Sequence, residues 1–217
     1  MPYLLPQPFL VAAVQISPAF LDRDTTVDRA CQAIAEAGSR GARLVVFPEA
    51  FVPGYPLWVW SIAAGQTQDL RALYAELLDQ AVTIPSAAIA QLCDAARGAG
   101  VYVAIGVNER NVEASGTSLY NALLFIGADG RILGMHRKLV PTAGERLVHA
   151  QGDGSGSPRT TRRWGVSGDS SAGRTTCPSL GRRSITPAST CMSRRRGIGA
   201  SHGCRRCVTS RRRDVST

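Results

Sequence analysis

Residues 41–58 read GARLVVFPEAFVPGYPLW, and the fold class follows from this segment and its neighbours. Leu44 to Phe47 form a short, continuously apolar run, which is typical of a strand buried on both faces. Glu49 follows at the end of this strand, where ligands bind in α/β sheets. Two prolines and a glycine come next and predict a stiff loop. Such a loop would hold Tyr55 and Trp58 as fixed aromatic walls beside Glu49.

The flanking segments predict a strand-helix-strand unit around this stretch. Residues 9–16 are apolar, and residues 25–40 carry apolar side chains at helical intervals. A helix between two buried strands implies a parallel pair joined by a right-handed crossover. The sequence further predicts helices over residues 69–80 and 86–97, strands over residues 102–107, 119–126 and 132–136, and a hairpin turn at residues 128–130. The fold class is therefore α/β up to about residue 155.

A second polar motif ends the last predicted strand. Residues 136–142 read HRKLVPT, and Lys138 is the only lysine of the chain. A lysine at a strand end is usually only solvated, so this position alone would indicate no function. Glu145 lies in a short loop just downstream and adds another charged group to the same region.

Together, these segments make residues 9–156 resemble the nitrilase and cyanide hydratase branch of the carbon-nitrogen hydrolase superfamily. The resemblance implies a nitrilase-like αββα sandwich, of which this chain supplies only the N-terminal part, and a homo-oligomer for the intact family member. It implies a small-molecule nitrile substrate and no metal or organic cofactor. Cyanide hydratase and aliphatic amidase activities are the alternatives within the superfamily, and the FVPGYPLW loop favours a nitrile.

The resemblance also implies roles for five residues. Glu49 would be the general base, Lys138 would stabilise charge on the substrate, and Glu145 would be a supporting acid. Tyr55 and Trp58 would contact the substrate. In this family a cysteine thiol attacks the substrate, and a carboxylate must first take its proton. A fixed ammonium group then stabilises the charge that develops.

Composition divides the chain near residue 156. Residues 1–156 carry 11 Lys and Arg against 14 Asp and Glu, whereas residues 157–217 carry 14 Arg against 2 Asp. The tail has no apolar periodicity, and a segment of this kind cannot bury enough apolar area to offset its ordering entropy. We therefore expect the N-terminal part of a hydrolase domain over residues 1–156 and a disordered tail without a domain over residues 157–217.

The tail also lacks the expected nucleophile. The family's cysteine belongs to a CWEN-type motif that follows the lysine, and this chain has no such motif. Cys177 is the nearest cysteine by position, but its neighbours Thr176 and Pro178 match nothing in the family. No nucleophile is therefore matched in this chain.

A one-base slip accounts for the missing motif. Residues 170–178, SSAGRTTCP, can be encoded so that the neighbouring frame reads LICWENYMP, and residues 189–198 so that the same frame reads VDVHVAPTWD. Two family-like segments in one frame are hard to obtain by chance, so we expect a frameshift near Gly156. The chain would then hydrolyse no nitrile. Its missing strands would leave apolar faces exposed, which predicts aggregation.

A different class of function, nucleic-acid binding, would depend on the arginine runs at residues 194–196 and 211–213. Such runs bind phosphates non-specifically, but no aromatic side chains interleave with them, so we expect no specific nucleic-acid partner. Cys204 and Cys207 have zinc-like spacing without a complete ligand set, and no metal site is expected. A poor secretory signal and the lack of a long apolar run predict a cytoplasmic protein with no membrane partner.

Overall fold

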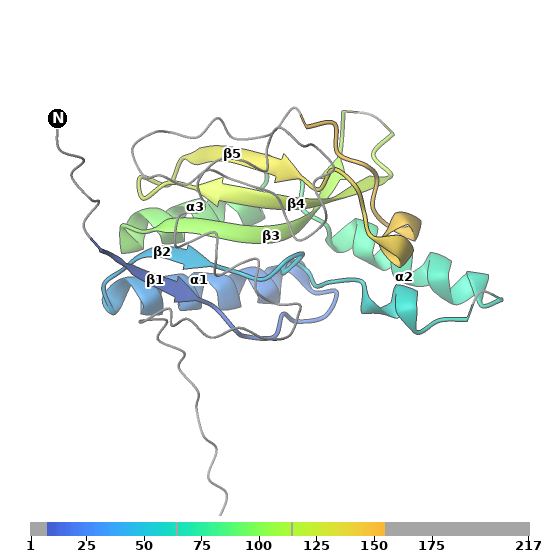
Figure 1. Ribbon diagram of the computed structural model, residues 1–217, viewed down its shortest axis with the longest axis horizontal. Helices are drawn as coiled ribbons and strands as arrows, with labels where there is room; N and C mark the ends of the chain where they lie inside the picture. The colour runs from blue at the N-terminus through green and yellow to red at the C-terminus, as the bar shows by residue number, and fades with distance from the viewer. Residues whose placement is uncertain (1–7, 64, 114, 155–217) are drawn as a thin grey trace, which may run out of the picture.

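The computed structural model describes residues 8–63, 65–113 and 115–154. They form a five-stranded sheet in the order β1-β2-β3-β4-β5 (Figure 1). The first three strands run parallel, and β4 and β5 pair antiparallel to their neighbours. The elements in chain order are β1 (Leu10–Ala13), α1 (Arg23–Ser39), β2 (Ala42–Val46), the 3-10 helix η1 (Leu57–Trp60), α2 (Thr67–Gln80), α3 (Ala87–Ala99), β3 (Tyr102–Asn111), β4 (Ser118–Ile126), β5 (Ile132–Arg137) and the 3-10 helix η2 (Ala143–Leu147).

Every predicted helix and strand is present, which confirms the α/β fold class. Helix α1 begins two residues before its predicted start because Asp22 caps it, accepting a 2.9 Å hydrogen bond from the Thr25 amide. Ser86 caps α3 as predicted. Strand β1 ends at Ala13 and is shorter than the predicted strand over residues 9–16. The β4–β5 hairpin turns at Gly130, whose φ of 77° favours glycine.

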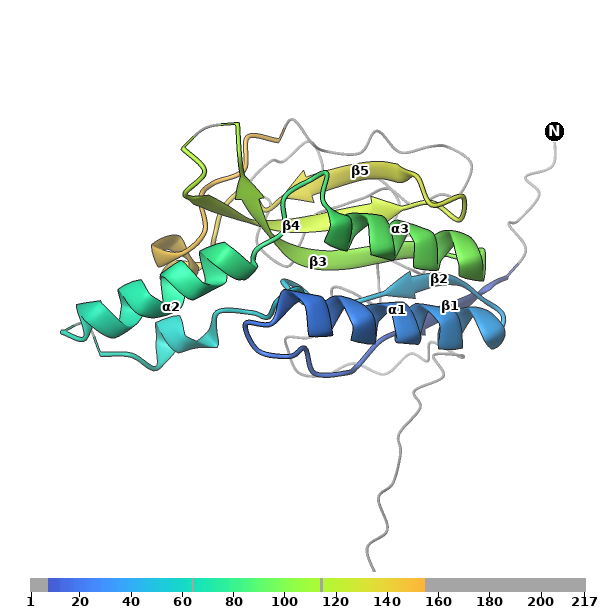
Figure 2. The same ribbon diagram turned by 180° about the vertical axis from the view of Figure 1, so that it is seen from behind.

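Helices α1 and α3 lie side by side over one face of the sheet (Figure 2). Side chains alternate along a strand, so Ile105 and Val107 of β3 pack into the core beneath these helices, together with Val27 and Ile34 of α1. Gly106 and Asn108, which alternate with these two residues along β3, face the opposite side of the sheet. This alternation separates the packing side of the sheet from the side that carries the polar residues described below.

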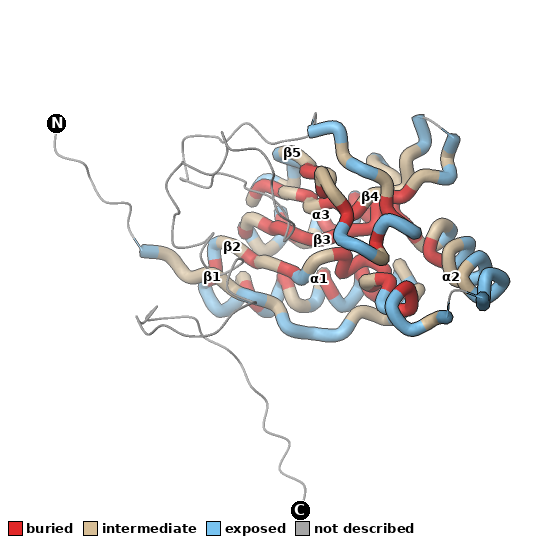
Figure 3. Tube along the Cα trace, turned by 45° about the vertical axis from the view of Figure 1, so that its right-hand side comes forward, coloured by how far each residue is buried: buried red, intermediate tan, exposed pale blue. Residues whose placement is uncertain are grey.

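The face opposite the two helices carries Leu44, Val46, Leu123 and Phe125, all of which are half-buried. Figure 3 shows the buried positions concentrated along the sheet and many exposed positions on α2. The described residues thus supply one helix layer and one sheet layer of the expected sandwich. The expected aggregation stays a prediction, and the predicted boundary at residue 156 and the tail lie outside the described residues.

Helix α2 extends beyond the end of the sheet (Figure 1) and packs with η1 in a second apolar cluster. The fully buried residues Leu77 of α2 and Leu119 of β4 belong to this cluster, together with Trp58 of η1 and Val148. It holds η1, which follows the segment that carries Tyr55, in one apolar cluster with α2 and Val148. No helix within the described ranges is long and apolar enough to cross a membrane.

A buried ion pair fixes β5 against β3 on the helix side of the sheet. Arg137 Nε and Nη2 donate to the two carboxylate oxygens of Glu109 at 2.7 and 2.5 Å. The Arg137 guanidinium also lies 4.3 Å from the centre of the Tyr120 ring, in a cation–π contact. Because neighbouring side chains alternate, this pair directs the next residue, Lys138, to the opposite face.

We expect Glu109→Gln to lower the free energy of unfolding by roughly 2–4 kcal/mol, since it leaves a largely buried guanidinium without its carboxylate. Urea denaturation of the chain would measure the loss. Asp94→Asn is the matched control, because it breaks an Arg97–Asp94 pair whose side chains are 61% and 65% exposed. Such exposed pairs contribute about 0–1 kcal/mol. Equal losses in the two variants would contradict a stabilising role for the Glu109–Arg137 pair.

Candidate active site

Glu49 projects from a bulge between β2 and its continuation along β3. The amide of Phe47 donates to Ala104 O at 2.8 Å, and the amide of Val52 donates to Gly106 O at 3.1 Å, so the chain leaves the sheet between these two points. A Cβ on Gly106 would lie 2.4 Å from both Ala50 N and Pro48 O. The bulge therefore rests directly on a glycine of β3, on the face opposite α1 and α3.

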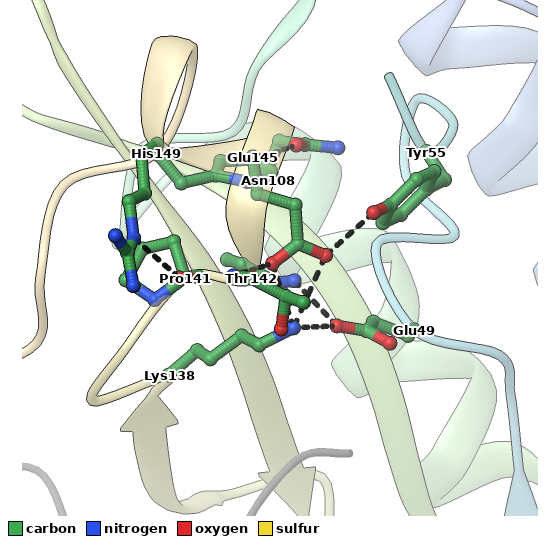
Figure 4. Close-up of polar contacts among 10 residues, drawn as sticks. Glu49, Tyr55, Asn108, Lys138, Pro141, Thr142, Glu145 and His149 are labelled. Carbon is green, nitrogen blue, oxygen red and sulfur yellow. Dashed lines mark hydrogen bonds and ion pairs between the residues drawn. The ribbon is translucent and has the colours of Figure 1, made fainter. Parts of the chain in front are cut away.

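The ammonium group of Lys138 joins two carboxylates that are far apart in the sequence. Lys138 Nζ lies 2.8 Å from Glu49 Oε1 and 2.8 Å from Glu145 Oε2 (Figure 4). The side chains of Lys138 and Glu145 are each only 3% exposed, whereas that of Glu49 is 31% exposed. The cluster thus has a buried half and one carboxylate that reaches solvent.

Glu145 is held by its own helix and by Tyr55. The Thr142 amide donates to Glu145 Oε2 at 2.6 Å, within a capping box at the start of η2. The Tyr55 hydroxyl donates to Glu145 Oε1 at 2.5 Å (Figure 4). Glu145 therefore links the loop that follows Glu49 to the segment that follows Lys138.

The surroundings of these groups fix their protonation states. Burial alone would lower the pKa of Lys138, but its hydrogen bonds to Glu145 and Glu49 outweigh burial, and the pKa is raised. Burial would raise the pKa of Glu145, but the Lys138 and Tyr55 hydrogen bonds outweigh it, and the pKa is lowered. Burial and Glu145 together raise the pKa of Tyr55. At neutral pH the site therefore holds an ammonium, a carboxylate and a protonated phenol.

The structure brings together four of the five predicted site residues: Glu49, Tyr55, Lys138 and Glu145. It places Trp58 elsewhere. Trp58 is only 8% exposed and belongs to the apolar cluster of η1 and α2, rather than to the hydrogen-bonded group around Glu49. Substrate contact by Tyr55 and by Trp58 stays a prediction.

Sequence reasoning missed Asn121 of β4, which completes the contacts of Glu49. Asn121 Nδ2 donates to Glu49 Oε1 at 2.7 Å, and its backbone carbonyl accepts from the amide of Lys138 at 2.8 Å. The available signal is the register of two strands, because Asn121 pairs with Asn108, an asparagine in the buried part of β3. Two facing amides in buried strands indicate a built polar site.

The arrangement leaves one oxygen of Glu49 available for chemistry. Lys138 and Asn121 both contact Oε1, and no hydrogen bond engages Oε2 within the described ranges. A carboxylate fixed through one oxygen and open at the other can accept a proton from a group placed beside it. The described residues contain no group of three His, Cys, Asp or Glu that could hold a metal ion.

Comparison with known proteins identifies the family. Residues 10–177 match the carbon-nitrogen hydrolase family. The chain is 40% identical over 150 residues to a nitrilase from Bacillus sp. (strain OxB-1) and 43% identical over 149 residues to an aliphatic nitrilase from Rhodococcus rhodochrous. These alignments cover 69% and 68% of this chain but only 42% and 38% of the relatives, so the chain spans about two fifths of their length.

Solved structures show a looser likeness. An amidase from Nesterenkonia sp. aligns with 70% of this chain and 51% of its own, at 18% identity and a TM-score of 0.48. A glutamine-dependent NAD+ synthetase from Acinetobacter baumannii aligns with 66% of this chain and 24% of its own, at 21% identity and a TM-score of 0.41. The family match covers more than half of the sequence, and the chain belongs to the carbon-nitrogen hydrolase family.

Proposed function

We propose that the intact form of this protein is a nitrilase, which converts a nitrile to a carboxylic acid and ammonia through a cysteine thiol. The observation that carries the proposal is the Lys138 ammonium held between Glu49 and Glu145, at 2.8 Å from each. This set provides a base that reaches solvent and a fixed positive charge that is almost completely buried. Thiol-dependent hydrolysis of a carbon–nitrogen bond needs both groups.

In the proposed mechanism Glu49 is the general base, and Oε2 is the oxygen that receives the proton. The thiol gives its proton to this carboxylate, and the sulfur forms a bond to the nitrile carbon. Glu49 then returns this proton to the nitrile nitrogen, which gives a thioimidate and leaves Glu49 as a carboxylate again. Lys138 stabilises the negative charge that develops during this step, and Glu145 keeps Lys138 charged and in place.

Water completes the reaction in two further steps. One water molecule adds across the carbon–nitrogen double bond of the thioimidate and gives a tetrahedral intermediate with a hydroxyl and an amino group. The amino group takes the hydroxyl proton and leaves as ammonia with the electron pair of the carbon–nitrogen bond, which forms the thioester. A second water molecule gives a proton to Glu49 and attacks the thioester carbon. The carbon–sulfur bond breaks, the acid is released, and the thiol recovers its proton. These steps need no metal and no organic cofactor.

A nitrile is the proposed substrate because the relatives that match at 40% and 43% identity are described as nitrilases. The stiff loop that carries Tyr55 is the part of this chain that we expect to shape substrate choice. A homo-oligomeric state and a cytoplasmic location for the intact protein are further parts of the proposal.

We further propose that this chain is inactive because it lacks the nucleophile. The cysteines among the described residues are Cys31 and Cys93, which lie in α1 and α3 on the helix side of the sheet. Glu49, Lys138 and Glu145, together called the acid–lysine cluster below, lie on the opposite face. Burial raises the pKa of both thiols, so they also have little thiolate character. Cys177 lies outside the described residues.

A gene in which one base is restored near the Gly156 codon would test the proposal. Its product, called the frame-restored protein below, should release ammonia from nitriles and contain a cysteine within a CWEN-type sequence. Ammonia release should be measured with nitriles, cyanide and amides in parallel, with the present chain as the control. Preference for an amide, or hydration of cyanide alone, would refute the nitrile assignment.

The present chain itself should release no ammonia from any of these substrates. Activity that survives Cys177→Ala but is lost in Glu49→Ala would show that another nucleophile serves the site. Resequencing of the DNA around the Gly156 codon tests the frameshift independently of any assay.

A further inference from the structure

Next to the acid–lysine cluster lies a buried polar pair that the proposed mechanism does not use. It consists of Asn108 of β3 and His149, which are 0% and 4% exposed. His149 Nε2 lies 2.8 Å from Asn108 Oδ1, although the two residues are 41 positions apart. Polar side chains this deeply buried are retained where their hydrogen bonds hold specific segments together.

The contacts of Asn108 determine which way its amide points. Asn108 Nδ2 donates to the carbonyl oxygens of Val52 at 3.1 Å and Gly54 at 3.0 Å. Carbonyl oxygens only accept, so both hydrogens of the amide nitrogen are used, and the nitrogen cannot exchange places with Oδ1. Oδ1 therefore faces His149 as an acceptor.

This orientation determines the tautomer of His149. An amide oxygen cannot donate, so the hydrogen between the two side chains belongs to His149 Nε2. His149 Nδ1 is buried and has no hydrogen-bond partner among the described residues. Burial also lowers the pKa of His149 to about 4, which keeps Nδ1 unprotonated at neutral pH.

The pair lies between the two segments that form the site. On one side, the amide of His149 donates to Glu145 O at 2.7 Å, which fastens it to η2. On the other side, Asn108 holds the carbonyl of Gly54, the residue before Tyr55. Tyr55 then reaches back to Glu145 at 2.5 Å and closes a ring of contacts (Figure 4).

We infer that Asn108 and His149 are positioning residues, which set the Tyr55 loop against Glu145 through a neutral Nε2–H form of His149. Neither residue touches the reacting atoms of the proposed mechanism. Their effect on catalysis would pass through Tyr55 and Glu145, so that part of the inference rests on the proposed function. The geometric part does not, and it can be tested on the present chain.

Histidine labelled with ¹⁵N in the full chain tests the tautomer directly. The chain has three histidines, and loss of one signal in His149→Gln assigns His149. Long-range proton–nitrogen spectra at neutral pH should show a protonated Nε2 and a bare Nδ1. A protonated Nδ1, in either the other neutral tautomer or the imidazolium, would overturn the inference.

Two replacements of His149 test the positioning role. In His149→Gln the side-chain amide can still donate to Asn108 Oδ1, whereas His149→Leu retains apolar volume but cannot donate. Tyrosine labelled at the ring carbon that bears the hydroxyl reports on the Tyr55 hydrogen bond, and Tyr55→Phe assigns its signal among the five tyrosines. The signal should stay in place in the glutamine variant and shift towards that of solvent-exposed tyrosines in the leucine variant.

A purely packing role predicts the opposite order, since leucine suits a buried apolar space better than glutamine does. An unchanged Tyr55 signal in His149→Leu, or an equal shift in both variants, would overturn the inference. None of these measurements uses nitrile turnover. A frame-restored protein without nitrilase activity would therefore refute the proposed function and leave this result unaffected.

Discussion

Glu49→Gln in the frame-restored protein is expected to lower kcat for nitrile hydrolysis by about 10²–10⁴-fold, the usual contribution of a positioned general base. The glutamine oxygen can replace Oε1 and still accept from Lys138 and Asn121 at the observed 2.8 and 2.7 Å. The amide nitrogen then occupies the place of Oε2 and cannot take a proton. The variant therefore removes the base and keeps the local geometry.

Steady-state ammonia release measures this effect, and urea denaturation of the same variant shows whether the fold is kept. Glu113→Gln is the control, because Glu113 is exposed and has no contact with the cluster in the described part of the chain. It should leave kcat unchanged. A Glu49→Gln enzyme with a raised KM and an unchanged kcat would show that Glu49 binds substrate rather than moving a proton.

The sequence predicts the elements well because each carries a local signal. The helix over residues 25–40 follows from apolar spacing, and the strand over residues 44–47 follows from a short apolar run before Pro48. These signals lie within a few residues of one another. The bulge that carries Glu49 has no such signal, since it depends on Gly106, a residue on another strand.

The charged members of the site are also predictable, but their contacts are not. Glu49 and Lys138 are identified by motif, yet only the register of β4 and β5 brings Lys138 beside Asn121 and Glu49. Trp58 shows the limit of a local argument. Its position in the stiff loop predicts an aromatic wall, and no local pattern indicates that the chain turns into η1 there and places Trp58 in one apolar cluster with residues of α2.

Asn108 and His149 show a different limit. Each is a single polar residue in its own segment, and neither belongs to a motif that would single it out. Their meaning comes from a contact across 41 positions, which no local pattern indicates. Contacts between single polar residues that are far apart in the sequence are therefore found only from the structure.

Lys138→Met is expected to lower the free energy of unfolding of the present chain by about 3–5 kcal/mol at neutral pH. The methionine side chain is unbranched like that of lysine, is one atom shorter, and carries no charge. Glu145, whose side chain is 3% exposed, would keep a negative charge without its partner. The variant would thus leave an uncompensated buried carboxylate. Removing one partner of a buried ion pair in this way destabilises the fold more than replacing both partners does.

The pH dependence of this loss has a definite sign. In the unaltered chain the hydrogen bond from Lys138 holds the pKa of Glu145 below the ordinary value of 4.5 for a glutamate. Their pairing therefore stabilises the fold above about that pH and is lost as Glu145 becomes protonated at lower pH. In Lys138→Met the carboxyl can become neutral at a higher pH, which relieves its buried charge. The difference in unfolding free energy between the two proteins should therefore be largest near pH 7 and shrink towards pH 4.

A second variant separates this electrostatic account from a simple packing defect. Glu145→Gln added to Lys138→Met removes the unpaired charge, so the double variant should be more stable at pH 7 than Lys138→Met alone. Urea denaturation of the unaltered chain, both single variants and the double variant completes the cycle. A double variant that loses the sum of the two single losses would show that Lys138 and Glu145 stabilise the fold independently, and the proposed mechanism would then lose its reason for a buried, fixed ammonium beside Glu49.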